Sequence, residues 1–132
     1  MNRQRVESGT IWEDQVGYCR AIKAGPAIFV SGTTAVDADG NVVGEGDVYQ
    51  QCIFIFQKIE AALRELQVSM EEVVRTRTFI TDISEFQNFA RAHSEVFDAI
   101  RPAASCVEIS RTVDPRLLVE IEVDAYVNDG PR

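Results

Sequence analysis

The sequence has little of what metal-binding, disulfide-bonded and membrane proteins need. It has a single histidine, His93, and three cysteines, without a Cys-x-x-Cys pair or any Cys/His spacing typical of a metal site. An odd number of widely spaced cysteines predicts free thiols in a reducing compartment. The longest apolar run, CIFIF, has five residues, and the first fifteen residues lack the apolar core of a signal peptide. We therefore expect a cytoplasmic protein with no metal site and no membrane association.

Clusters of basic residues and the common nucleotide-binding and catalytic motifs are also absent. The net charge is −8 and the sequence pI is about 4.6. Because Lys and Arg contacts to phosphate dominate the affinity of nucleic-acid-binding proteins, this charge disfavours nucleic-acid binding. The chain contains no GxGxxG, P-loop, GxSxG or HExxH motif either, so none of the sites that these motifs build is indicated.

What the sequence does have is the composition of a globular domain and a clear alternation of element types. Apolar residues make up 45% of the chain and charged residues 26%, close to the average for globular proteins. Asp47 is a suitable N-cap for a long helix, and Ser69 with Glu72 and Ser84 with Gln87 have the spacing of capping boxes. The expected elements of a single domain, 1–132, are strands over 18–23, 27–33, 73–82, 103–110 and 117–127, helices over 48–66 and 86–100, and a short additional strand near Val6. Amphipathic helices of this kind need one sheet face to cover, which predicts a two-layer α+β domain.

Cys106 lies in the strand expected over 103–110. Alternation along the strand puts Ala104, Cys106, Glu108 and Ser110 on one face. That face is the more polar one, so it need not lie in the core. A free cysteine is most often a small buried apolar side chain, and no cation or base adjoins Cys106 in the sequence to activate a thiol. At this point two roles are open for Cys106, that of a core residue and that of a residue in a functional site.

The strand expected over 117–127 splits into an apolar face and an acidic face. Its acidic face consists of Glu120, Glu122 and Asp124. These carboxylates could act in general acid–base chemistry or form a ladder of ion pairs with Arg75 and Arg77 of the strand over 73–82. We favour the ladder for most of them, although one glutamate at the edge of a pocket would suffice for chemistry.

Two further polar residues lie at suggestive positions. His93 lies on the apolar stripe of its helix, which favours a partly buried histidine with one hydrogen bond over a catalytic role. Strand alternation would place Tyr18, Arg20 and Ile22 on one face. Arg20 is then either a guanidinium held near a tyrosine on a rigid element or a surface arginine.

Five segments of the chain resemble the RidA/YjgF family of reactive-imine deaminases, which are also described as endoribonuclease L-PSP-like. They are VGYCRAI, IFVSGTTAVDADGNVVG, VVRTRTFITDISEF, RPAASCVEIS and LVEIEVDAYV, and they cover roughly residues 18–127. The resemblance implies a chorismate-mutase-like fold, in which two helices back one sheet, and a homotrimer with clefts between neighbouring subunits. Family members of known activity hydrolyse enamine or imine products of pyridoxal-phosphate enzymes, such as 2-aminoacrylate, to keto acids and ammonia. They use neither a metal nor a cofactor.

The resemblance also assigns site residues by position. The matching cleft positions are Tyr18, Ser31, Gly32, Cys106 and Glu120, of which the glutamate positions a water molecule near the imine. Where the family has the arginine that binds the substrate carboxylate, this chain has Ala104. The chain therefore resembles a branch of the family that lacks this arginine. We expect Arg20, with Arg101 as the second candidate, to bind an anionic or polar group of a different substrate.

Three functions follow as expectations. The first is cofactor-free hydrolysis of a small enamine, imine or related C–N metabolite, with Glu120 activating water and Cys106 shaping the cleft wall. The second is a trimer that binds or senses a small metabolite without turnover, because the cleft is kept while the arginine is lost. The third is RNA cleavage or inhibition of translation, which the net charge of −8 disfavours.

Overall fold

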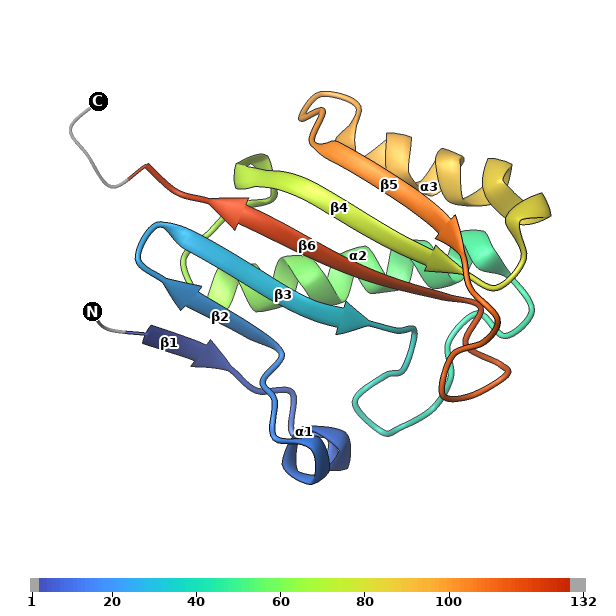
Figure 1. The fold of residues 1–132 in the computed structure, drawn as a ribbon, viewed down its shortest axis with the longest axis horizontal. Coiled ribbons are helices and arrows are strands. Elements are labelled where there is room, and N and C mark those ends of the chain that lie inside the picture. Colours follow the sequence, from blue (N-terminus) through green and yellow to red (C-terminus); the bar gives the residue numbers. More distant parts are fainter. Residues whose placement is uncertain (1–2, 129–132) are drawn as a thin grey trace.

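The protein folds around one six-stranded sheet with the strand order β1-β2-β3-β6-β4-β5 (Figure 1). The computed structural model describes residues 3–128, so both ends of the domain expected over 1–132 lie outside the described residues. Neighbouring strands are antiparallel except β4 and β5, which are parallel. The elements are β1 (Arg3–Val6), α1 (Ile11–Val16), β2 (Ala21–Ala24), β3 (Ala27–Thr33), α2 (Val48–Glu65), β4 (Val73–Ile80), α3 (Phe86–Phe97), β5 (Ala103–Glu108) and β6 (Val119–Tyr126).

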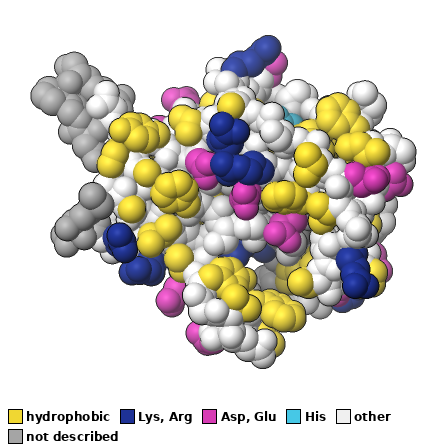
Figure 2. Space-filling view, viewed as in Figure 1, with side chains coloured by type: hydrophobic (Ala, Val, Ile, Leu, Met, Phe, Trp, Pro, Cys, Tyr) yellow, Lys and Arg dark blue, Asp and Glu magenta, His cyan; other side chains and the backbone are white. Residues whose placement is uncertain are grey.

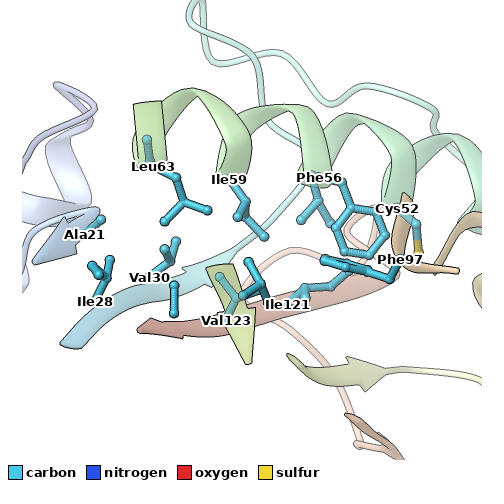
Figure 3. Close-up of a cluster of buried hydrophobic side chains, with 14 of the residues drawn as sticks. Ala21, Ile28, Val30, Cys52, Phe56, Ile59, Leu63, Phe97, Ile121 and Val123 are labelled. Carbon is cyan, nitrogen blue, oxygen red and sulfur yellow. The ribbon is translucent and has the colours of Figure 1, made fainter. Parts of the chain in front are cut away.

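Helices α2 and α3 cover one face of the sheet, and the other face is open (Figure 1). The core lies between the two layers, where Ile59 and Leu63 of α2 meet Val30 of β3 and Ile121 and Val123 of β6 (Figure 3). All five side chains are buried, and each such burial contributes roughly 1.5–3 kcal/mol. The two-layer α+β fold with a sheet backed by two helices is therefore confirmed.

Local signals set the ends of most elements. The Asp47 side chain accepts a hydrogen bond from the Gln50 N–H at 3.0 Å, which caps α2 as expected. The Ser69 N–H donates to the Glu72 carboxylate at 3.0 Å, as the first capping box requires. The expected short strand near Val6 is β1, which pairs with β2.

The second predicted capping box, Ser84 with Gln87, is wrong. The Asp82 side chain caps this turn instead, accepting from the Ser84 N–H at 2.9 Å and from its hydroxyl at 2.6 Å. Ser84 is therefore a donor inside a short 3₁₀ turn, Ile83–Glu85, which precedes α3. The carboxylate of Asp82, which directly precedes the turn, is a stronger hydrogen-bond acceptor than a serine hydroxyl, so Asp82 is the cap.

The first predicted strand starts later than expected, at Ala21 and not at Tyr18. The six-residue helix α1, too short for a periodic pattern, was not predicted. It ends at Gly17 in the left-handed region with φ 88°. The Tyr18 N–H then donates back to the Glu13 carbonyl at 3.1 Å. Residues 18–20 consequently lead the chain out of the helix before pairing begins.

Cys106 faces the helical layer, whereas Ala104, Glu108 and Ser110 of the same strand face are exposed, so the prediction that this face need not be core is confirmed for all of it but Cys106. In register, Ala104 lies beside Thr76 and Cys106 beside Thr78, and both threonines are buried. Cys106 is half-buried against the core. The polar character of this face comes from its last residues. Glu108 is exposed and accepts from a backbone N–H at 3.0 Å where the helical layer ends.

Candidate functional site

A β-bulge in β3 separates two residues from the regular sheet. The register with β6 shifts between Val30, which pairs with Val123, and Thr33, which pairs with Ile121. Ser31 lies inside this bulge, and its hydroxyl donates to the Cys19 carbonyl at 2.8 Å. A bulge of this kind bends the strand and redirects its side chains. The bulge is why this part of β3 can form a site.

Gly32, the second bulge residue, lies directly beneath the Glu120 side chain. A Cβ atom added at Gly32 would lie 2.1 Å from Glu120 Oε2, so only glycine permits this approach. Burial raises the pKa of Glu120, the nearby Glu122 raises it further, and Arg20 partly opposes both effects. The result is a half-buried carboxylate on the open side of the sheet.

Arg20 lies beside this carboxylate and is itself buried, with an exposed fraction of 8%. Its Nη1 donates to the Gly32 carbonyl at 3.0 Å and to the Thr33 hydroxyl at 3.1 Å. Its guanidinium carbon lies 5.5 Å from the centroid of the Tyr18 ring, within the range of a cation–π contact. Its Nε is buried and has no hydrogen-bond partner among residues 3–128.

These residues line a cleft of about 340 Å³ between α1, the β3 bulge and the loop before β6. Figure 2 shows the hollow next to α1 on the open side of the sheet. The structure thus brings together five residues predicted from the sequence, namely Tyr18, Arg20, Ser31, Gly32 and Glu120. We refer to this hollow as the cleft.

Lys58 of α2 also lines the cleft and was missed by the sequence analysis. Its Nζ donates to the Thr34 carbonyl at 2.8 Å and to the Val36 carbonyl at 2.9 Å. Burial, with a smaller contribution from Arg20, lowers the pKa of Lys58 to about 8. The signal for Lys58 in the sequence was its position as a lone lysine directly before Ile59, at the edge of the apolar stripe of α2.

Helix α1 forms a wall of the cleft with Trp12 and Val16. The buried carboxylate of Glu13 holds this helix by accepting from the Ser8 N–H at 3.0 Å, from the Ser8 hydroxyl, and from the Thr10 hydroxyl at 3.3 Å. Glu13 is therefore a structural carboxylate, and it fixes where Trp12 lies.

Two other predicted site residues lie elsewhere in the chain. Arg101 is exposed and donates to the Asp98 carboxylate at 2.9 Å. With Ala104 it lines a separate groove of about 300 Å³ between α3 and β5. Cys106 lines neither hollow. One chain therefore does not unite Arg101 or Cys106 with Glu120, and their place in the site stays a prediction.

His93 is a partly buried structural histidine, as predicted. Its Nε2 lies 2.9 Å from the Thr76 hydroxyl, and its ring packs against Phe89 and Phe97. Burial lowers the pKa of His93. These contacts account for its position without a catalytic role.

The ion-pair ladder on the open face is confirmed for Arg77. Its Nη1 lies 3.3 Å from the Glu122 carboxylate and 3.1 Å from that of Asp124. Arg75 and Glu120 take part in no ion pair within 4.0 Å among residues 3–128. Glu120 is thus the carboxylate of the acidic strand face that is left free for chemistry.

The described residues contain no group of three or more His, Cys, Asp or Glu side chains arranged to hold a metal ion. None of the helices within residues 3–128 has both the length and the apolar character that a membrane span requires.

Comparison with known proteins identifies the family. The family model described as Endoribonuclease L-PSP matches residues 12–127. The chain belongs to this family. This is the RidA/YjgF family, which five segments of the sequence resemble. Two relatives support the assignment. An uncharacterised Streptomyces coelicolor protein is 38% identical, over 93% of this chain and 91% of its own length. A RutC family protein of Pyrococcus abyssi is 33% identical, over 83% and 85% respectively.

Solved structures of relatives share the fold. A Mycobacterium tuberculosis protein described as a member of the YjgF/YER057c/UK114 family is 41% identical, with a TM-score of 0.86 over 96% of this chain and 100% of its own. A putative endoribonuclease of Thermotoga maritima is 29% identical, with a TM-score of 0.78 over 86% and 87%. Membership of the L-PSP family supports either an imine-deaminase-like role toward a small molecule or an endoribonuclease-like role.

Proposed function

We propose that the protein hydrolyses a small enamine, imine or related C–N metabolite in the cleft, without a cofactor. The observation that carries this proposal is Glu120, a half-buried carboxylate without an ion pair, which lies over Gly32 and beside Arg20. A carboxylate with a raised pKa is a better proton acceptor than an exposed one, which suits a general base.

In this mechanism Glu120 accepts a hydrogen bond from a water molecule and directs its oxygen at the C=N carbon. The new C–O bond forms as the C=N π electrons move to nitrogen, and Glu120 takes the proton of the attacking water. Returning that proton to nitrogen gives a carbinolamine. Glu120 then takes the proton of its hydroxyl group and passes it to the amino nitrogen, so that the C–N bond breaks as the C=O bond forms, which releases ammonia and leaves a carbonyl product. Arg20 binds an anionic or polar substituent of the substrate and so holds the reacting carbon near Glu120.

We further propose that the active form is a homotrimer in which a neighbouring subunit closes each cleft. The open sheet face exposes large apolar side chains, with exposed fractions of 48% for Phe29, 49% for Val107 and 57% for Tyr126. Exposed apolar patches of this kind mark interaction surfaces. The family resemblance places Cys106 in such a cleft, and Arg101 stays the second candidate for its cation; both depend on the neighbouring subunit.

A coupled assay tests the proposed hydrolysis. An amino-acid oxidase, with catalase to remove peroxide, generates imines from a panel of amino acids, and a carbonyl-reactive amine traps those that remain. We expect the protein to accelerate loss of imine. Glu120→Gln should slow this by about 100- to 10,000-fold, the usual contribution of a general base. Glu122→Gln, which alters a ladder residue, is the matched control. Absence of acceleration by the unaltered protein across the panel would overturn the proposal.

A second candidate is metabolite binding without turnover, which Ala104 favours because the family's carboxylate-binding arginine is absent. A small molecule that raises the melting temperature and is recovered unchanged would support it. RNA cleavage is the third candidate. The net charge of −8 and the pairing of Arg77 with two carboxylates argue against it. Tight RNA binding with a steep salt dependence would reverse this order.

A further inference from the structure

Lys58 lies in the cleft under conditions that favour the neutral form of its side chain. It is half-buried in α2 and lines the cleft. Among residues 3–128 no carboxylate oxygen lies within 4.0 Å of its nitrogen. Burial disfavours the charged form of a lysine when no opposite charge is in contact with it. The surroundings of Lys58 therefore favour a free amine over an ammonium group.

The hydrogen bonds of Lys58 also fit a neutral amine. Its Nζ donates to the Thr34 carbonyl at 2.8 Å and to the Val36 carbonyl at 2.9 Å. An ammonium group has three hydrogens to donate, whereas a neutral amine has two hydrogens and a lone pair. The two carbonyls match the two hydrogens of the neutral form. With both hydrogens bound in this way, the lone pair of Nζ stays available to a molecule in the cleft.

The charged groups around Lys58 strengthen this tendency on balance. Burial first, and the nearby Arg20 second, lower the pKa of Lys58 to about 8, while Glu13 and Asp37 partly oppose the change. Glu120 lines the same cleft. An ordinary lysine has a pKa of about 10.4, so the neutral fraction of Lys58 at neutral pH is larger by roughly two orders of magnitude. A desolvated lysine beside a second cation is the arrangement that activates lysine as a nucleophile.

A large part of the cleft wall is apolar, which indicates the kind of molecule that Lys58 meets. The aliphatic and indole side chains of this wall are those of Trp12, Val16, Val36, Val113 and Leu117. The volume of about 340 Å³ is at the lower end of the range for small-molecule sites. Lysine amines react with carbonyl groups to form imines. The cleft therefore suits a small, uncharged aldehyde or ketone with an apolar substituent.

We propose that Lys58 is a nucleophilic amine that forms an imine with a small, uncharged aldehyde or ketone in the cleft. Its lone pair forms the C–N bond as the C=O π electrons move to oxygen. Glu120 takes one proton from the nitrogen and passes it to that oxygen, which gives a carbinolamine. The second nitrogen proton reaches the hydroxyl group by the same route, and water leaves as the C=N bond forms. The reverse steps release the carbonyl compound, so the capture is reversible.

Reductive trapping with 3-methylbutanal and cyanoborohydride tests this directly, because the reagent converts the imine into a stable adduct. Lys23 is the only other lysine of the chain. It lies in β2, outside the residues that line the cleft, and is the control within the same molecule. Peptide mass mapping at pH 8 should find the adduct forming on Lys58 at least tenfold faster than on Lys23. In urea-unfolded protein the two rates should be similar.

The pH dependence of trapping gives a second readout. The rate at Lys58 should rise with a midpoint near pH 8, since the neutral amine is the reactive form. Arg20→Met removes a cation that favours the neutral amine, so the midpoint should move up. Asp37→Asn removes a carboxylate that favours the ammonium form, so the midpoint should move down. Thermal unfolding verifies that each variant is folded, and Asp37→Asn decides if Arg20→Met does not fold.

Three results would overturn the inference. They are trapping at Lys58 no faster than at Lys23 in the folded protein, a midpoint equal to that of the unfolded chain, and a midpoint that neither variant moves. The inference is separable from the proposed function, because trapping uses an aldehyde and needs no hydrolysis of an imine substrate. Selective trapping without such hydrolysis would keep the inference and remove the function, whereas hydrolysis without selective trapping would do the reverse.

Discussion

At the scale of single residues, Gly32 connects the two groups assigned to chemistry. Its α carbon lies beneath Glu120, and its carbonyl accepts a hydrogen bond from Arg20 at 3.0 Å. A change at this one position therefore affects the proposed base and leaves most of the fold untouched.

Replacing Gly32 with alanine should remove activity while the protein stays folded. The new Cβ would lie 2.1 Å from Glu120 Oε2 in the present arrangement, so Glu120 must move. We expect kcat/KM to fall about as far as in Glu120→Gln. The double variant should be no worse than Glu120→Gln alone, because both changes act on the same carboxylate. Additive losses would show that Gly32 acts in another way.

The pH dependence of turnover should reveal Glu120. The base must be ionised to accept a proton, and burial raises the pKa of Glu120 above that of an ordinary glutamate. Activity should therefore fall on acidification at a higher pH than an exposed glutamate would give, and it should recover as the pH rises through that raised pKa. A log kcat/KM profile measures this. Glu122→Gln should move the midpoint down, since Glu122 contributes to the raised pKa.

Much of this residue-level site could be predicted from the sequence, because family motifs mark Tyr18, Ser31, Gly32 and Glu120. Lys58 could not, because its helix pattern shows only that it borders the apolar stripe. Its role depends on which backbone carbonyls the loop after β3 brings to it, and no local pattern encodes that meeting.

At the scale of elements, α1 forms one wall of the cleft, and the hydrogen bonds of the Glu13 side chain hold α1 in place. Glu13→Ala removes the acceptor of three donors from Ser8 and Thr10. It should cost roughly 1–3 kcal/mol, the usual cost of leaving buried groups unsatisfied. Trp12 is the only tryptophan and lies next to Glu13, so its fluorescence should shift to the red as α1 loosens. Asp14→Ala, an exposed acidic neighbour in the same helix, should leave both stability and fluorescence unchanged.

Helix α2 is tied to the loops around the cleft by one buried amide. The Gln51 Nε2 donates to the Gly44 carbonyl at 3.2 Å and to the Arg116 carbonyl at 2.8 Å, and its Oε1 accepts from the Leu118 N–H at 2.9 Å. Gln51→Leu would leave three backbone groups without this partner, so we expect a loss of about 3 kcal/mol in urea unfolding. Gln57→Leu, at an exposed position of the same helix, should change stability by less than about 0.5 kcal/mol.

The elements themselves followed from local pattern wherever the pattern was long. The apolar stripe of α2 and the alternation of β6 predicted both elements within a few residues. The six residues of α1 show no such pattern, and the polar end of β5 concealed that Cys106 faces the helices. In both places tertiary contacts, and not periodicity, decide the structure.

At the scale of the whole molecule, we expect the open sheet face to be the surface on which three chains associate. Light scattering should give three times the chain mass of 14.7 kDa. Phe29→Glu, which puts a charge on the exposed apolar part of this face, should give a monomer and lower turnover. Gln57→Glu adds the same charge on the exposed side of α2 and should remain trimeric. A monomeric mass for the unaltered protein would refute the assembly.

The two-layer arrangement is a property of one chain, so sequence and structure both give it, whereas the strand order comes from the structure alone. How Cys106 and Arg101 relate to the cleft is a property of the assembly, and a single chain does not contain that information. For this reason one chain brings five of the predicted site residues together in the cleft, whereas Cys106 and Arg101 lie outside it.

The bulge in β3 lowers the stability of the sheet and at the same time forms part of the binding site. Removing one residue between Val30 and Thr33 would let β3 and β6 pair without interruption, and an unbroken ladder is the more stable sheet. The same deletion would withdraw the glycine from beneath Glu120 and the carbonyl from Arg20. Selection for thermostability alone should therefore tend to erase this bulge, and a chain that retains it accepts a weaker sheet in exchange for a place where a small molecule can bind.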